Sequence, residues 1–214
     1  AGSLRRSAGT ALGVFDFTVN NAGFVEITSG QTSFRAGGVL GGTWFAGNGA
    51  TLQFGGATFE NTGGTLFNGA GRFLVQGGTV RIANAQAVTS FLELGNGGVI
   101  DGTGTLTING RFDWTGGVMQ GTGKTILSAS STPTIGGGGF IQRTIDNSAN
   151  VVFTGAAGHF QIGQGCVWNN LAGSVFDLKA DNYVLAAYGG AATFNNSGTV
   201  RRTAGTALTV FDFT

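Results

Sequence analysis

The sequence has little of the chemistry that catalytic and metal sites need. It contains one cysteine, Cys166, and one histidine, His159, which excludes an internal disulfide framework and a thiolate zinc site. A single proline excludes collagen and proline-rich linkers. Charged residues make up only 10 % of the chain and leave a net charge of +1. Nucleic acid and anionic membrane surfaces are therefore not expected as partners.

Long hydrophobic segments are missing as well. Glycine, threonine or asparagine interrupts every apolar stretch, so we expect no transmembrane helix, and the first residues do not resemble a signal peptide. Glycine, in contrast, supplies 42 of the 214 residues, about three times its usual share. Because 41 % of the residues are hydrophobic, the chain is too apolar for a disordered spacer and should fold.

The two ends of the sequence carry copies of the same segment. Residues 3–18, SLRRSAGTALGVFDFT, and residues 199–214, TVRRTAGTALTVFDFT, are identical at twelve of sixteen positions. Their offset, from 3 to 199, is 196 residues. We therefore expect residues 1–214 to form one continuous domain, made of one 196-residue unit and the start of the next, within a longer tandem array.

Short strands are predicted throughout the unit. Apolar and polar residues alternate over about four positions and glycine then interrupts, a pattern typical of strands with one buried face. No segment keeps a helical apolar stripe, and the best helical candidate, residues 83–88, is predicted to be a loop. The predicted strands are 14–17, 24–27, 51–54, 72–75, 79–82, 90–94, 105–108, 159–162 and 175–178.

A second signal lies in the turns, where paired asparagines precede a small residue, a glycine and a strand. Their spacing of about 20–26 residues is typical of one coil of a β-solenoid. Stacked coils would place asparagine over asparagine, so that side-chain amides bond in ladders. The predicted fold is all-β, a right-handed parallel β-helix of about nine to ten coils, rising about 43 Å for each unit. The asparagines concerned are Asn20, Asn21, Asn61, Asn147, Asn169, Asn170, Asn195 and Asn196.

An antiparallel sandwich or propeller is the alternative fold. Two-residue Asn-Gly and Asp-Gly turns are typical of antiparallel hairpins. The sequence has them at Asn48-Gly49, Asn68-Gly69, Asn96-Gly97, Asn109-Gly110 and Asp101-Gly102.

Several strings resemble a known kind of protein. VNNAGFVEITSGQTSF, GTGTLTINGRFDWTGGVMQGTGKT, WNNLAGSVFDLKAD and FNNSGTVRRTAGT are similar to glycine- and asparagine-rich repeats of giant secreted bacterial surface proteins. More loosely, they resemble the β-helical stalks of filamentous-haemagglutinin-type adhesins and autotransporter passengers. The resemblance implies a right-handed parallel β-helix outside the cell or on its surface, and it transfers no catalytic residue.

Few residues are candidates for chemistry. His159 is expected on the surface of a strand, and Cys166 is expected to be a small buried hydrophobe. The ten carboxylates are scattered, and Asp101, Asp113 and Arg111 form the one local cluster, which we interpret as a solvated charge group. We therefore predict no enzyme activity, no cofactor and no metal. Thr103, Thr105 and Thr107 alternate as in ice-binding solenoids, but other threonines do not keep the register.

The arginine pairs Arg5-Arg6 and Arg201-Arg202 occupy equivalent positions in the repeat. A strand would bury one arginine of each pair, so we expect both pairs to straddle bends in solvent. They are also candidates for contacts between rods, with Asp16 or Asp212 as partners.

The predicted function is structural. We expect a stiff extracellular rod, a fibre, sheath or adhesin stalk, that associates with further copies of itself end to end or in lateral bundles. The alternative is a carbohydrate- or matrix-binding module, in which Trp44, Trp114, Tyr183 or Tyr188 stacks on surface polysaccharide. A polysaccharide-degrading enzyme would need acids clustered in a groove.

Overall fold

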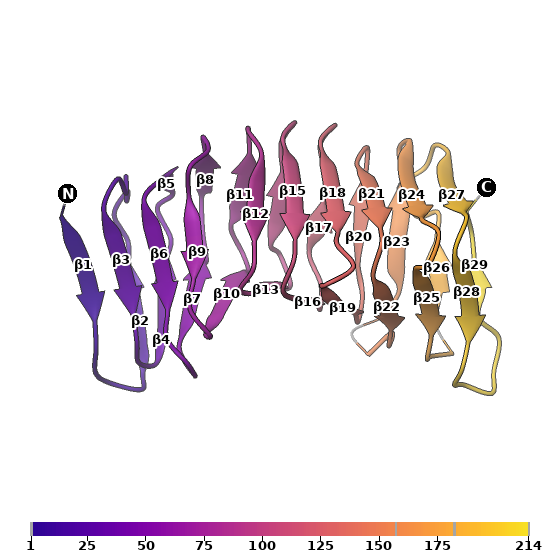
Figure 1. Cartoon of the computed structure of the whole chain (residues 1–214), viewed down its shortest axis with the longest axis horizontal. Coiled ribbons are helices and arrows are strands. Elements are labelled where there is room, and N and C mark those ends of the chain that lie inside the picture. Colours follow the sequence, from indigo (N-terminus) through magenta and orange to yellow (C-terminus); the bar gives the residue numbers. More distant parts are fainter. Residues whose placement is uncertain (1, 157, 182, 214) are drawn as a thin grey trace.

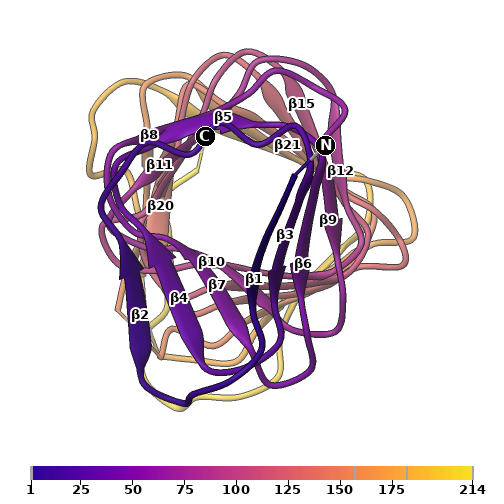
Figure 2. The same cartoon turned by 90° about the vertical axis from the view of Figure 1, so that its left-hand side faces the viewer.

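The computed structural model describes residues 2–156, 158–181 and 183–213. In these residues the chain forms short strands and turns, with no helix, wound into a parallel β-solenoid of about nine turns. Figure 1 shows the coils stacked along the long axis from the N-terminal to the C-terminal end. Viewed from the N-terminal end, the chain runs clockwise as it recedes, so the coil is right-handed (Figure 2).

Each coil after the first contributes a strand to each of three faces. Sheet B forms one face along the whole solenoid. Its strands, in spatial order, are β2 (Leu12–Phe15), β4 (Gln31–Phe34), β7 (Thr51–Phe54), β10 (Arg72–Val75), β13 (Phe91–Leu94), β16 (Arg111–Trp114), β19 (Thr132–Ile135), β22 (Asn150–Phe153), β25 (Val175–Leu178) and β28 (Thr199–Arg202).

Sheet C forms the second face and begins one coil later than sheet B. Its strands are β5 (Gly38–Leu40), β8 (Thr58–Asn61), β11 (Thr79–Ile82), β14 (Val99–Asp101), β17 (Val118–Met119), β20 (Gly138–Ile141), β23 (Phe160–Gly163), β26 (Tyr183–Leu185) and β29 (Val210–Phe211).

The third face is divided into two sheets that do not pair with each other. Sheet A contains β1 (Ser3–Arg6), β3 (Phe24–Ile27), β6 (Thr43–Ala46) and β9 (Leu66–Asn68). Sheet D contains β12 (Gln86–Val88), β15 (Thr105–Ile108), β18 (Lys124–Leu127), β21 (Thr144–Asn147), β24 (Cys166–Asn170) and β27 (Ala192–Asn196).

All of the strand pairs in the described residues are parallel, so the antiparallel alternative is wrong. Strands that pair are one coil apart in the sequence, and the coils differ in length. Thr134 pairs with Val152 across a short coil, whereas Tyr183 pairs with Val210 across a longer one. The Asn-Gly steps turn corners between faces instead of closing hairpins, as at Asn48-Gly49 between β6 and β7.

Most predicted strands coincide with observed ones. The predicted 24–27, 51–54, 72–75, 79–82, 105–108 and 175–178 are β3, β7, β10, β11, β15 and β25, and 14–17, 90–94 and 159–162 are displaced by one or two residues. The prediction of a loop over 83–88 was wrong at its C-terminal end. Gln86–Val88 forms β12 because Gln86 and Val88 are buried and the strand pairs with β15.

The interior is aromatic and aliphatic. Strand β3 shows the general pattern, with Val25 and Ile27 buried and Phe24 and Glu26 facing outward. All three tryptophans are fully buried, and edge-to-face contacts join rings across the coil, such as Trp114 and Phe160 at 4.9 Å. Because no coil buries a face alone, this continuous core stabilises the stack as a whole.

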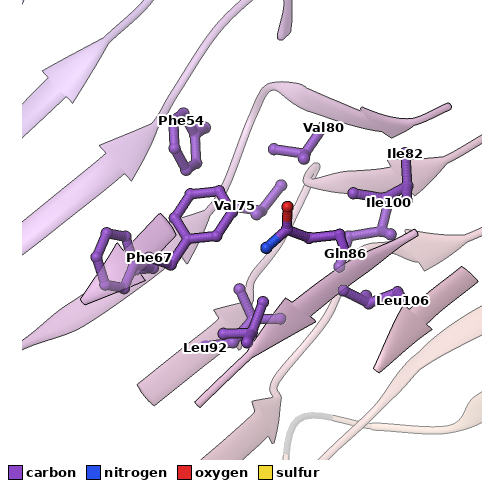
Figure 3. Close-up of a pocket in the computed structure, with 11 residues that line it drawn as sticks. Phe54, Phe67, Val75, Val80, Ile82, Gln86, Leu92, Ile100 and Leu106 are labelled. Atoms are coloured by element: carbon purple, nitrogen blue, oxygen red, sulfur yellow. The ribbon is translucent and has the colours of Figure 1, made fainter. Parts of the chain in front are cut away.

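The break between β9 and β12 encloses a small cavity of about 20 Å³. Apolar side chains such as Phe67, Val80 and Leu92 line it, and the Gln86 amide is its polar group (Figure 3). Gln86 accepts a hydrogen bond from Asn61 Nδ2 at 2.8 Å and donates to the Thr65 carbonyl at 3.1 Å. The amide therefore supplies hydrogen bonds where the strand ladder is interrupted.

Candidate functional site

Among the described residues, the carboxylates are spread over different faces of the solenoid. Asp113 pairs with Arg111 at 2.5 Å on sheet B, whereas Asp101, on sheet C, lies 3.6 Å from Arg81. The local cluster expected from the sequence is thus split between two faces. In the part of the chain that the structure describes, no three His, Cys, Asp or Glu side chains are placed to hold a metal ion.

The other residues that the sequence suggested for chemistry are Cys166, which is buried, and His159, which lies on the outside. Cys166 is a buried free thiol, as predicted, and burial raises its pKa. The His159 ring lies 4.9 Å from the Tyr183 ring on the outside of sheet C. Thr105 and Thr107 pair with Lys124 and Ile126, so no threonine lattice continues from coil to coil.

Three inner asparagines of the turns form a ladder along the edge between sheets D and B, in which Asn147 and Asn170 are buried. Asn147 Nδ2 donates to Asn170 Oδ1 at 2.9 Å, and Asn170 Nδ2 donates to Asn196 Oδ1 at 2.8 Å. Asn147 also accepts a hydrogen bond from the Ala149 amide, and Asn21 and Asn61 accept the equivalent bond from Gly23 and Gly63. Asn147, Asn21 and Asn61 thus each close their own corner, and in sheet D Asn147 and Asn170 also bond to the next coil.

The outer asparagines form a second ladder in solvent. Asn195 Nδ2 donates to Asn169 Oδ1 at 2.8 Å, and Asn169 Nδ2 donates to Asp146 Oδ1 at 2.7 Å. Lys124 Nζ extends the row with a 2.7 Å ion pair to Asp146. Asn20 lies in another corner, where its Oδ1 accepts from the Val39 amide. The sequence pattern did not identify Lys124, which lies outside every asparagine turn.

The arginine pairs lie in strands rather than at bends, which corrects the expectation from the sequence. In β1, Arg5 faces outward and pairs with Glu26 at 2.7 Å. The Arg6 guanidinium folds over the following corner, where Nε donates to the Ala8 carbonyl and Nη2 donates to the Gly9 and Ala11 carbonyls. Its second nitrogen, Nη1, donates to Gln31 and Thr32 in the next coil.

The second copy of the motif builds the same corner. In β28, Arg202 donates to the Ala204 and Ala207 carbonyls, the counterparts of Ala8 and Ala11. Gly9 and Gly205 both adopt positive φ, at 85° and 90°, a conformation that favours glycine. The interactions with other coils differ, because Arg201 pairs with Asp177 at 3.1 Å and Arg202 pairs with Asp181, both in the preceding coil.

A third arginine corner, at Arg143, was not identified from the sequence. Arg143 is fully buried between sheets C and D. Its guanidinium donates to Thr125 Oγ1 at 2.8 Å and to the Lys124 and Gln120 carbonyls at 3.0 and 3.1 Å. A longer bond of 3.3 Å reaches the Gly102 carbonyl two coils away. Burial lowers the pKa of Arg143 to about 10, against the opposing effect of the Asp101 charge.

A groove of about 400 Å³ runs across the outside of sheet C. Its floor is built of glycines from successive coils, and Asn96, His159, Gln161 and Tyr188 form its polar and aromatic walls. The Tyr188 ring lies so close to Gly139 that a Cβ there would be 2.9 Å from Cε2. Trp44 and Trp114, which the sequence suggested as exposed stacking residues, lie in the core instead, because both alternate inward with apolar neighbours.

The fold defines the chain as a parallel β-solenoid. Compared with known protein families, curated proteins and solved structures, the chain matches none. Over the described residues, no helix has the length and apolar character needed to cross a membrane.

Proposed function

We propose that this chain is a non-catalytic structural repeat of an extracellular or cell-surface rod, such as a fibre, sheath or adhesin stalk. The observation that carries the proposal is the combination of a 196-residue sequence repeat with a solenoid whose main-chain ladder runs from β2 to β28 on one face. A solenoid edge is a template for further strands, so successive units can stack into one stiff body.

The side chains support the same interpretation. Polar groups are used to join coils, in the asparagine ladders and in pairs such as Arg72 with Glu93 at 2.8 Å. Hydrogen bonds between successive coils give the rod its axial stiffness, since bending must stretch them on one side.

The length of concatenated chains tests this proposal. Chains of one, two and three units should grow in longest dimension by about 43 Å per unit, because about nine coils are added at a spacing of about 4.8 Å. Small-angle X-ray scattering measures this increment. A matched two-unit chain with a flexible Gly-Ser linker of about 20 residues at the junction should lose the defined length. If the unmodified two-unit chain scatters like the control with the flexible linker, the proposal of a stiff rod is wrong.

A second function, binding of surface polysaccharide, is supported by the groove on sheet C. Tyr188 offers an aromatic face and Asn96 and Gln161 offer amides, a combination suited to the apolar faces and hydroxyl groups of sugars. Affinity electrophoresis in gels containing neutral or acidic polysaccharides should show retardation that Tyr188→Ala abolishes. Phe24→Ala, at an exposed aromatic residue of sheet A, is the matched control and should not change mobility. Equal mobility with and without polysaccharide would exclude this function for the polymers tested.

A further inference from the structure

The two copies of the repeated motif lie on different faces of the solenoid. Strand β1 belongs to sheet A, whereas β28, its counterpart in the second copy, belongs to sheet B. Likewise β2 belongs to sheet B and its counterpart β29 to sheet C. One unit therefore spans nine coils and one additional face.

The asparagine corners also occur on more than one face. The Asn21 corner leads into β3 on sheet A, and Asn21 Nδ2 donates to the Thr43 carbonyl at the start of the next strand on that sheet. The Asn170 corner leads into β25 on sheet B, and Asn170 Nδ2 donates to the equivalent carbonyl, that of Thr199. Asn21 and Asn170 are 149 residues apart, so they are not counterparts in the 196-residue repeat. They show that the same kind of corner can lead into either sheet, whereas the arginine motif shows the shift between the two copies.

We propose that the edge formed by β27, β28 and β29 receives the next repeat unit one face further round the coil. Successive units are then related by about a third of a turn about the rod axis, in addition to the twist of the coils themselves. The partner is a further copy of this chain's own sequence, from residue 19 onward, and the inference rests on the proposed function as a tandem rod.

The arginine contacts are complementary across such a junction. Arg5 pairs with Glu26 in the following coil, whereas Arg201 pairs with Asp177 in the preceding coil. In a continued rod, Arg201 would lie between Asp177 and Glu26 of the next unit, because β28 would pair with the next β3 as β1 pairs with β3. One guanidinium can satisfy both carboxylates, because it has several donors.

The corner arginines fit together in the same way. Arg202 uses Nε and Nη2 within its own coil and toward Asp181, and its Nη1 has no hydrogen-bond partner among the described residues. The equivalent nitrogen of Arg6 bonds Gln31 and Thr32 of the following coil. In a continued rod, Arg202 could therefore keep its bonds to its own corner and to Asp181 and use Nη1 for the following coil, as Arg6 does.

The asparagine ladder would also cross the junction. Asn196 is the last member of the row that includes the buried Asn147 and Asn170; it is itself exposed, and its corner leads into β28 on sheet B. With a shift of one face, Asn21 of the next unit reaches the same edge between sheets D and B. Every surface feature, including the groove on sheet C, would then recur on all three sides of the rod.

Spin labels on a two-unit chain test the inference. The chain consists of residues 1–214 followed directly by residues 19–214, with Cys166→Ser in both units. One variant carries Thr199→Cys with Phe24→Cys of the second unit, and another carries Thr193→Cys with the same second cysteine. A pair within the first unit, Ser3→Cys with Phe24→Cys, is the positive control, since these residues are register partners.

The shift of one face predicts strong dipolar broadening for the Thr199 pair, because adjacent strands are about 4.8 Å apart. The Thr193 pair, on adjoining faces, should show none. Broadening of the Thr193 pair instead, or of neither pair in a chain that scatters as a rod, would overturn the inference and leave the rod intact. A two-unit chain that does not scatter as an extended rod would overturn the proposed function itself.

Discussion

The buried corner at Arg143 and the exposed corners at Arg6 and Arg202 use one device in two environments. In each, a guanidinium donates to main-chain carbonyls where the chain turns between faces. Arg143 is enclosed by coils on both sides, whereas Arg6 and Arg202 each meet one neighbouring coil and remain partly in solvent. The comparison indicates that the stabilising effect of such a corner depends on how many coils it joins and how far it is desolvated.

The largest effect is expected from Arg143→Met. Methionine fills similar apolar space but leaves the Gln120 and Lys124 carbonyls and the Thr125 hydroxyl without this donor. The loss of these bonds should exceed the relief from no longer burying a charge, and lower the free energy of unfolding by about 2–3 kcal/mol. Urea denaturation followed by circular dichroism measures this difference.

Arg81→Met is the matched control for that experiment. Arg81 makes two ion pairs, with Glu60 and Asp101, but lies exposed on the outside of sheet C. Exposed ion pairs contribute little, so this variant should stay within about 1 kcal/mol of the unmodified chain. An Arg143→Met variant as stable as the Arg81→Met variant would contradict the interpretation of Arg143 as a structural link between coils.

The strands could be predicted because alternation is a local pattern in the sequence, and the repeat could be predicted because its two copies are nearly identical. Alternation in Thr105–Ile108 or Val175–Leu178 specifies a strand with one buried face wherever it is placed. The two arginine corners show the same locality, since Ala8 and Ala204 accept equivalent bonds on different faces.

The face on which each motif lies could not be predicted in this way. Coil lengths vary along the solenoid, so the position of a strand around the axis depends on every preceding corner. Burial of Arg143 was not predictable for a similar reason, because its acceptors lie one and two coils away. The groove on sheet C also arises only when glycines such as Gly97 and Gly117 are stacked.

A smaller effect is expected from opening the exposed corners. Arg6→Met and Arg202→Met each remove bonds to two or more carbonyls that water can reach, so each should cost about 1 kcal/mol or less. The loss should be local. Hydrogen exchange should accelerate in β2 for Arg6→Met and in β29 for Arg202→Met, with little change in central strands such as β16. Equal acceleration along the whole solenoid would indicate that these corners stabilise the entire stack, as Arg143 is expected to do.

The smallest effect is expected from protonation of Asp177, which holds β28 on β25. Although burial alone would raise its pKa, hydrogen bonds from Thr203 and Arg201 and the charges of Arg201 and Lys179 lower the pKa of Asp177 below its ordinary value of 3.8. A carboxylate with a lowered pKa stabilises the fold above the unfolded-state value, and this contribution is lost as the pH falls through the folded-state value.

The melting temperature of the unmodified chain should therefore exceed that of Asp177→Asn by a degree or two at pH 6, about the effect of one ion pair whose arginine lies in solvent. The difference should shrink as the pH falls below 3.8 and through the lowered pKa of Asp177. Asp113→Asn is the matched control, because Asp113 pairs with Arg111 within its own strand and does not join two coils. A difference for Asp177→Asn that does not shrink at all as the pH falls from 6 to 2.5 would show that the side chain acts through its shape and hydrogen bonds rather than its charge. In that case the negative charge of Asp177 would not be what holds β28 on β25, and Arg201 would contribute less to stability than the fully enclosed Arg143.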